Sequence, residues 1–270
     1  MARRCPVLGM IMCDTPIMST FIQSFAVAAV IFAASLIGLA LHPRLPSKHR
    51  AAETYAVVRL GVGMLSVLAS LVLGLLIATA KGANDSADTA MRSYAAELIL
   101  LDETFRDYGD AAAAPRAVLH RFTRTLLQDY WPEVAQGAAD PVKTDRLLEQ
   151  VREATRALAP VDAGQTWLRD QALGINVGLL RQRWLLIERA EPAVRPVVVM
   201  ILVSWIAFIF ASFGLDAPRN ATVIVSFAFC ALAIGGAMFL VLELDSPLAG
   251  LMKISSWPID NALRHMLATP

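Results

Sequence analysis

The chain has 270 residues, of which 56% are hydrophobic and only 17% are charged, and its formal net charge at pH 7 is +1. With a mean hydropathy of +0.54 it is too apolar for an ordinary soluble protein, in which about a quarter of the residues are charged. The balanced charge argues against nucleic-acid binding, which needs a basic face or stripe. Three cysteines at positions 5, 13 and 230 form no close pair, so no disulfide framework is predicted.

Four apolar runs dominate the sequence. Each has 20 to 22 residues without Asp, Glu, Lys, Arg or His: Phe21–Leu41, Leu60–Ala80, Pro196–Leu215 and Ala221–Leu242. A helix needs about 20 apolar residues to cross the hydrocarbon of a bilayer, whereas buried helices of soluble proteins are usually shorter and carry a polar stripe. The first run is also longer than the apolar core of a signal peptide, so we expect a retained helix. The sequence therefore predicts an all-α integral membrane protein with four spans.

The four runs lie two and two around a polar block at 81–195, which we expect to be a helical domain. Residues 1–20 and 243–270 are expected to form terminal tails. With four spans, both tails and the domain share one face of the membrane.

Lys and Arg near the membrane number nine on the side of the domain and five on the other side. Under the positive-inside rule this favours an inner-membrane protein with a cytoplasmic domain and cytoplasmic termini. The short link at 42–59 is denser in Lys and Arg than any other short segment, which favours the opposite orientation.

The first helix predicted in the polar block continues directly from the second span. Its apolar residues are spaced alternately four and three apart, as in a heptad seam: Ala87, Met91, Tyr94, Leu98, Leu101, Phe105 and Tyr108. Gly109 ends the pattern. Such a seam either packs inside the chain or packs between subunits.

Three more helices are predicted at about Pro115–Trp131, Pro141–Leu158 and Ala163–Arg189, and no segment has a convincing strand pattern. The last helix shows a second seam: Leu173, Val177, Leu180, Trp184 and Ile187. Gly174 and Gly178 within it favour a kink or a close helix contact. The simplest assembly is an antiparallel bundle whose first and last helices extend the second and third spans.

No motif indicates an active site. The four histidines at 42, 49, 120 and 265 are scattered, and the chain lacks HExxH, GxSxG and phosphate-binding glycine loops. Acidic pairs such as Asp102 with Glu103, or Glu188 with Glu191, are expected on solvated helix faces. We therefore expect no enzyme activity, no cofactor and no metal site.

Small side chains recur every four residues in the second span and form a ridge along one face: Ser66, Ser70, Gly74 and Ala78, followed by Gly82. Small residues let helices approach closely in lipid, and this is the commoner use of such a pattern. The alternative is a narrow water-accessible path, because two residues are hydroxylated and no bulky residue blocks that face.

The fourth span contains a similar close-approach pair, Ala231 and Gly235. It is followed by an acidic motif of four residues: Glu243, Asp245, Pro247 and Gly250. Carboxylates are costly in hydrocarbon, so these acids either mark the membrane edge or pair with Arg189 and Arg195, which are expected at the same face.

Several stretches resemble the bestrophin-like domain family of bacterial and plant membrane proteins. In chain order they are residues 58–66 with 71–81, 99–102 with 108–109, 130–132, and 242–250. The pattern Glu-x-Asp-x-Pro-x-x-Gly at 243–250 is the most specific, and Leu248 departs from the Phe that relatives often carry. The resemblance covers about residues 55 to 265.

Bestrophins are pentameric anion channels with four spans per subunit, cytoplasmic termini and a helical cytoplasmic part. The resemblance therefore implies a homo-oligomer in the lipid bilayer that conducts small anions. The competing hypothesis is a non-conducting scaffold or signalling adaptor that binds a partner helix through the seams at 87–108 and 173–187.

Overall fold

A computed structural model describes residues 16–44, 52–131, 141–189, 194–246 and 250–268, which form helices joined by short turns and include no strand. The chain divides into two compact units. We call Met1–Asn84 with Pro192–Lys253 the membrane unit, and Asp85–Glu191 with Ile254–Pro270 the helical unit. The predicted all-α class is confirmed.

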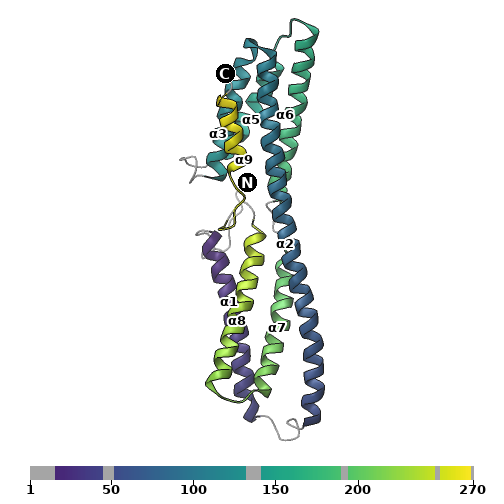
Figure 1. The fold of residues 1–270 in the computed structure, drawn as a ribbon, viewed down its shortest axis with the longest axis vertical. Coiled ribbons are helices and arrows are strands. Elements are labelled where there is room, and N and C mark those ends of the chain that lie inside the picture. Colours follow the sequence, from purple (N-terminus) through teal and green to yellow (C-terminus); the bar gives the residue numbers. More distant parts are fainter. Residues whose placement is uncertain (1–15, 45–51, 132–140, 190–193, 247–249, 269–270) are drawn as a thin grey trace, which may run out of the picture. The chain divides into compact units, whose positions relative to one another are not determined.

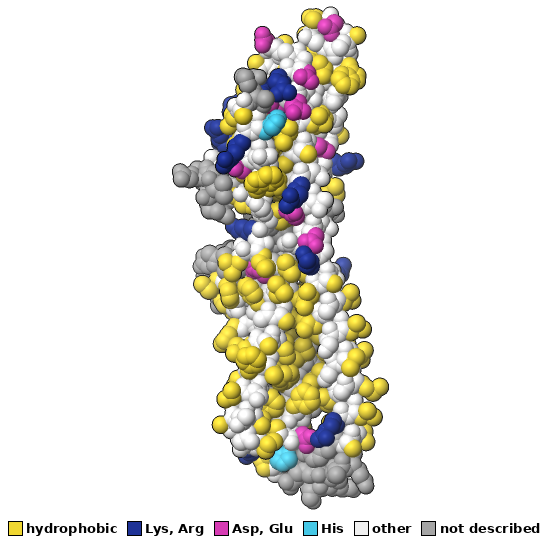
Figure 2. All heavy atoms as spheres, viewed as in Figure 1, with side chains coloured by type: hydrophobic (Ala, Val, Ile, Leu, Met, Phe, Trp, Pro, Cys, Tyr) yellow, Lys and Arg dark blue, Asp and Glu magenta, His cyan; other side chains and the backbone are white. Residues whose placement is uncertain are grey.

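The membrane unit contains α1 (Pro16–Leu41), the first half of α2 (Ala52–Tyr108), α7 (Pro196–Asp216) and α8 (Ala221–Leu244). A short turn, η2 (His42–Arg44), follows α1. The four long helices are labelled in Figure 1. All four helices are long and apolar enough to cross a membrane. Figure 2 shows apolar side chains covering much of the visible face of this unit, whereas charged side chains are frequent on the helical unit.

Helix α1 packs against both α7 and α8, and glycines allow the close approach. A Cβ atom added at Gly38 would overlap the carbonyl oxygen of Ala211, and one added at Gly214 would overlap that of Ser35. At Gly235 a Cβ atom would come within 2.9 Å of the Ala28 Cβ. The close contact predicted around Gly235 is confirmed, and these three helices form the tightly packed part of the unit.

The carboxyl ends of α1 and α7 cap each other. His42 directly follows α1, and its Nδ1 lies 2.5 Å from the carbonyl oxygen of Leu215. Arg219, which follows α7, donates to the carbonyl oxygens of Leu39 (2.9 Å) and Ala40 (3.2 Å). These carbonyls lie in the last turns of the helices, where intrahelical partners run out.

The two predicted helix extensions have different outcomes. Helix α2 runs without interruption from the second span into the helical unit, as expected. The extension of the last bundle helix into the third span is wrong, because Arg195 has extended backbone (φ −68°, ψ 131°) and Pro196 begins a new helix. Proline suits the first turn of a helix, where its missing N–H costs nothing, and it disfavours helical geometry in the preceding residue.

The helical unit consists of the second half of α2 with η4 (Asp110–Ala112), α3 (Ala113–Tyr130), α5 (Pro141–Arg156), α6 (Ala163–Arg189) and α9 (Trp257–Ala268). All seven residues of the seam on α2 are buried in it, from Ala87 to Tyr108. The first seam is therefore part of the core of this unit and is not available to a partner.

Helix α9 was not predicted, since residues 243–270 were expected to be a tail. It packs against α3 and buries Pro258, Ile259, Ala262 and Met266. The indole N–H of Trp131 donates to the carbonyl oxygen of Ile254 (2.9 Å), just before the helix.

The second predicted seam lies on the wrong face of α6. The buried residues are Ala172, Asn176, Leu179 and Arg183. Val177 and Trp184 of the expected seam are 60% and 65% exposed, and the side chain of Ile187 lies outside the described residues. Apolar periodicity was misleading because α6 buries two polar side chains, one of which is Arg183, whose Nε donates to Asp145 (2.7 Å). Gly178 does make the expected close contact, with the Glu97 carboxylate.

Candidate functional site

The ridge of small residues on α2 is open in the single chain. Ser66 is half-buried, whereas Ser70, Gly74 and Ala78 are exposed. A Cβ atom added at Gly74 would have no atom within 4 Å, in contrast to the packed glycines of α1, α7 and α8. The packing interpretation requires a helix that lies against this ridge. Among the described residues of the chain, no helix does so.

The face of α2 next to the ridge provides its contacts in the membrane unit. Val62, Ala69, Leu76 and Ala80 are buried and belong to one apolar cluster with Leu202 and other residues of α7 and α8. Bulky exposed residues occupy a stripe beside the ridge: Leu60, Met64, Leu68, Leu71 and Leu75. A lipid-facing surface is built from such bulky apolar side chains, and the ridge is chemically different from it.

The two hydroxyl groups on the ridge bond to their own helix. Ser66 donates to the carbonyl oxygen of Val62 and Ser70 to that of Ser66, both at 2.8 Å. These bonds satisfy the hydroxyl hydrogens without a neighbouring helix, and each hydroxyl oxygen can still accept a hydrogen bond. The ridge is thus a narrow polar strip that needs no partner.

The acidic motif after the fourth span is a buried clasp. Glu243 is 1% exposed, and its Oε1 accepts the backbone N–H groups of Leu251 and Met252 (3.0 Å for the latter). Gly250 has φ +92°, and a Cβ atom there would overlap the same carboxylate oxygen. Glycine is therefore required both by the backbone conformation and by the space that Glu243 occupies.

Asp245 ties the same region to the start of α7, because its carboxylate accepts the backbone N–H of Val194 at 3.1 Å. Arg195, one of the two expected partners, is exposed and makes no ion pair with the residues that the structure describes. The side chain of Arg189 and the whole of Pro247 lie outside the described residues. The two acids thus bind backbone N–H groups.

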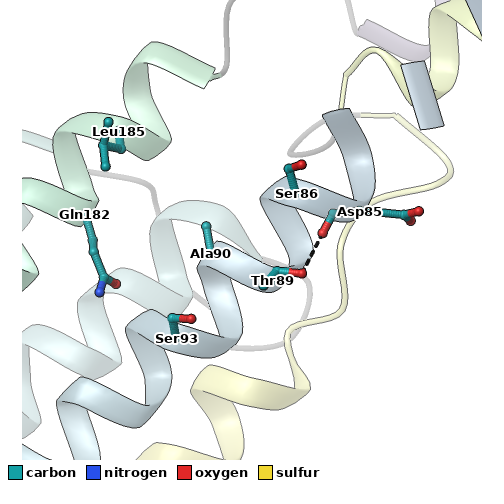
Figure 3. A pocket seen from close by; sticks show the side chains of 7 residues that line it. All are labelled: Asp85, Ser86, Thr89, Ala90, Ser93, Gln182 and Leu185. Atoms are coloured by element: carbon teal, nitrogen blue, oxygen red, sulfur yellow. Dashed lines mark hydrogen bonds between the residues drawn. The ribbon is translucent and has the colours of Figure 1, made fainter. Parts of the chain in front are cut away.

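A cavity of about 500 Å³ lies between α2 and α6 in the helical unit (Figure 3). Its polar lining comes from Asp85, Ser86, Thr89 and Ser93 of α2 and from Gln182 of α6, which extends toward α2. The hydroxyl of Thr89 donates to the carbonyl oxygen of Asp85 (2.9 Å), and Gln182 Nε2 donates to Glu97 Oε1 (2.6 Å). Small and hydroxylated residues thus continue along α2 beyond the ridge.

Asp102 was expected on a solvated face and is instead buried, with 1% exposure. Arg116 donates to it through Nε (2.9 Å) and Nη2 (3.2 Å), and His120 Nε2 lies 2.7 Å from the same carboxylate. Burial acts to raise the pKa of Asp102, but the hydrogen bonds from His120 and Arg116 outweigh it and hold the pKa below its usual value. The expectation was wrong because Arg116 and His120 come from α3, whose position the sequence of α2 does not reveal.

The described residues contain no group of three or more His, Cys, Asp or Glu side chains that could hold a metal ion.

The family model of the bestrophin-like domain matches residues 29–259. The chain belongs to the bestrophin-like family. The match spans both units of this bestrophin-like chain. It includes the ridge, the acidic motif, and Asp102 with its partners Arg116 and His120. A comparison with curated proteins gives no significant match.

Solved structures of similar fold include bacterial bestrophin homologues. A homologue from Klebsiella pneumoniae is 12% identical over 90% of this chain and 97% of its own, with a TM-score of 0.62. A variant of a Klebsiella pneumoniae homologue in which alanine replaces a tryptophan is 14% identical over 94% and 98%, with a TM-score of 0.63. A membrane protein solved as a proline-to-alanine variant is 13% identical over 91% and 98%, with a TM-score of 0.62. At these identities the likeness establishes the bestrophin fold for this bestrophin-like chain.

Proposed function

We propose that this protein is a homo-oligomeric channel of the inner membrane that conducts small anions along the ridge of α2, and that it has no enzyme activity. The observation that carries the proposal is the open ridge. Ser70 and Gly74 are exposed beside a stripe of bulky apolar side chains on the same helix. Copies of the chain arranged around an axis, with this strip facing inward, would enclose a narrow polar path.

The charges at the two ends of the ridge favour anions over cations. Arg59 lies seven residues before Ser66, and Lys81 lies seven residues after Gly74, so both share the face of the ridge. Arg59 is 73% exposed and pairs with Asp216 at 2.5 Å. Rings of basic side chains at the mouths of a pore concentrate anions there, and no acidic residue lies between them on α2.

The need for more than one copy follows from the small number of spans. Four helices leave little room for a central path, and three of them pack tightly on one another. The exposed stripe on α6, with Val177 and Trp184, offers a surface for a neighbouring copy. The excess of basic residues near the membrane on the side of the helical unit supports a cytoplasmic location for that unit and both termini.

Flux through purified protein in liposomes tests the proposal. Chloride and iodide should pass, and under a salt gradient the reversal potential should follow the anion. Ser70→Trp should block the path, whereas the matched variant Leu75→Trp, on the bulky stripe, should still conduct. Absence of flux from well-folded oligomers would exclude a channel.

The second candidate is a non-conducting scaffold or adaptor, and the apolar stripe on α6 is the observation that favours it. Exposed Trp184 and Val177 would bind an apolar helix of a different protein. The seam from Ala87 to Tyr108, which was expected to contribute, is buried in the helical unit.

Native mass and cross-linking at Val177 separate the two candidates. Cross-links between copies of this chain, in a complex whose mass is a multiple of one chain, support the channel. A different protein that copurifies from membranes, and is lost with Trp184→Asp but retained with the exposed control Trp167→Asp, would favour the adaptor.

A further inference from the structure

A second cavity, of about 320 Å³, lies in the helical unit where α2 ends and α3 begins. Its apolar walls are Phe105 and alanines of η4 and α3. Its polar lining consists of Arg106, Asp110, Arg116 and His120. The volume is near the lower end of the range for pockets that hold small molecules, roughly 300 to 1,000 Å³.

One end of this cavity is preorganised by the buried Asp102. That carboxylate fixes Arg116 and His120, and Arg116 also donates to the carbonyl oxygen of Met266 on α9 (3.4 Å). His120 uses Nε2 for this contact, which leaves Nδ1 for another partner. Fixed side chains lose little conformational entropy when a ligand binds.

Two opposite charges in the same cavity do not pair with each other. Among the described residues, the Arg106 guanidinium and the Asp110 carboxylate have neither a hydrogen bond nor an ion pair. In a continuous helix, side chains four residues apart would meet. Here Gly109, with φ +98°, ends α2 and takes Asp110 out of register with Arg106.

We propose that this cavity binds a small zwitterion, of the size of an amino acid, between these two charges. Its carboxylate would be held by Arg106 with His120, and its ammonium group by Asp110. A guanidinium fork matches a carboxylate geometrically. A simple anion would be repelled by Asp110 and a simple cation by Arg106, so selectivity comes from the unfavourable contact as much as from the favourable one.

The site does not depend on conduction, and binding alone tests it. Full-length protein in detergent is titrated with L-alanine, acetate and ethylammonium at constant ionic strength. L-Alanine should bind at least tenfold more tightly than either single-charge probe. A titration with L-alanine that shows no saturation up to about 10 mM overturns the proposal, since weaker binding would be unspecific.

Two variants assign the charges. Arg106→Gln should weaken L-alanine binding at least tenfold, and Arg106→Lys should restore part of it. Asp110→Asn should abolish the preference for L-alanine over acetate. The matched controls Asp107→Asn and Arg121→Gln remove exposed charges outside the cavity and should leave the affinities unchanged. Equal affinity in wild type and Asp110→Asn would overturn the site even if L-alanine binds.

Discussion

Small residues serve two different purposes in the membrane unit. In α1, α7 and α8, Gly38, Gly214 and Gly235 face backbone or Cβ atoms of a neighbouring helix so closely that a methyl group does not fit. On α2, Gly74 faces open space. Both patterns look alike in the sequence, because a glycine or serine every few residues in an apolar run is compatible with either. The atoms that a Cβ added to the glycine would meet distinguish a packing site from an open surface.

The largest expected effect is at the packed glycines. Gly214→Ala would drive a Cβ atom into the carbonyl oxygen of Ser35 and force α1 and α7 apart. We expect a loss of about 3 kcal/mol or more, since the neighbouring atom is backbone and cannot move aside. Thermal unfolding in detergent measures it. Unchanged stability would show that the tight contact between α1 and α7 does not exist.

The acidic clasp should be nearly as sensitive. Gly250→Ala combines a positive φ with a collision against the Glu243 carboxylate. A loss of about 2 kcal/mol is expected, because a residue with a side chain is strained in this conformation. Gly236→Ala is a control in the same unit, since its Cβ position is open; a similar loss there would mean that the effect is not specific to the clasp.

The reciprocal caps should have an intermediate effect. Arg219→Gln removes a charged donor from the last carbonyls of α1, and we expect a loss of about 1 kcal/mol. The melting temperature reports it. Arg264→Gln, which removes an exposed ion pair on α9, should change the melting temperature less, since such pairs contribute little.

The smallest effect, and the one of opposite sign, is expected on the ridge. Gly74→Ala should stabilise the chain by up to about 1 kcal/mol, because alanine favours the helix and no atom opposes its Cβ. The same substitution would thus stabilise at position 74 and destabilise at position 214. Destabilisation at both positions would show that a neighbouring chain packs against the ridge, and the proposed ion path along it would then be excluded.

Many elements were predictable because they depend on local patterns. Four uncharged runs specified the spans, and the heptad spacing from Ala87 to Tyr108 specified a packed face, which the structure places in the core of the helical unit. The contact at Gly235 followed from small residues in lipid. The cavity between Arg106 and His120 was not predictable, since it depends on Gly109 ending α2 and on the position of α3.

The failures share a cause. Apolar spacing on α6 pointed to Val177 and Trp184, yet the helix buries Asn176 and Arg183, whose partners come from other segments. Asp102 is buried for the same reason, and α9 becomes part of the core through contacts with α3. A polar side chain can be buried only when its partner is supplied from elsewhere.

The amino-acid sequence by itself determined membrane residence, the number of spans, the heptad spacing on α2 and membership of the bestrophin-like family. Hydrocarbon thickness and helix periodicity act on each segment alone, so these properties can be derived segment by segment. Only the tertiary structure decided which small residues are packed and which are open, that Glu243 and Asp245 bind backbone N–H groups, and that Arg106 and Asp110 share a cavity. Each of these depends on the distance between atoms far apart in the chain, and that distance is set by how the helices pack.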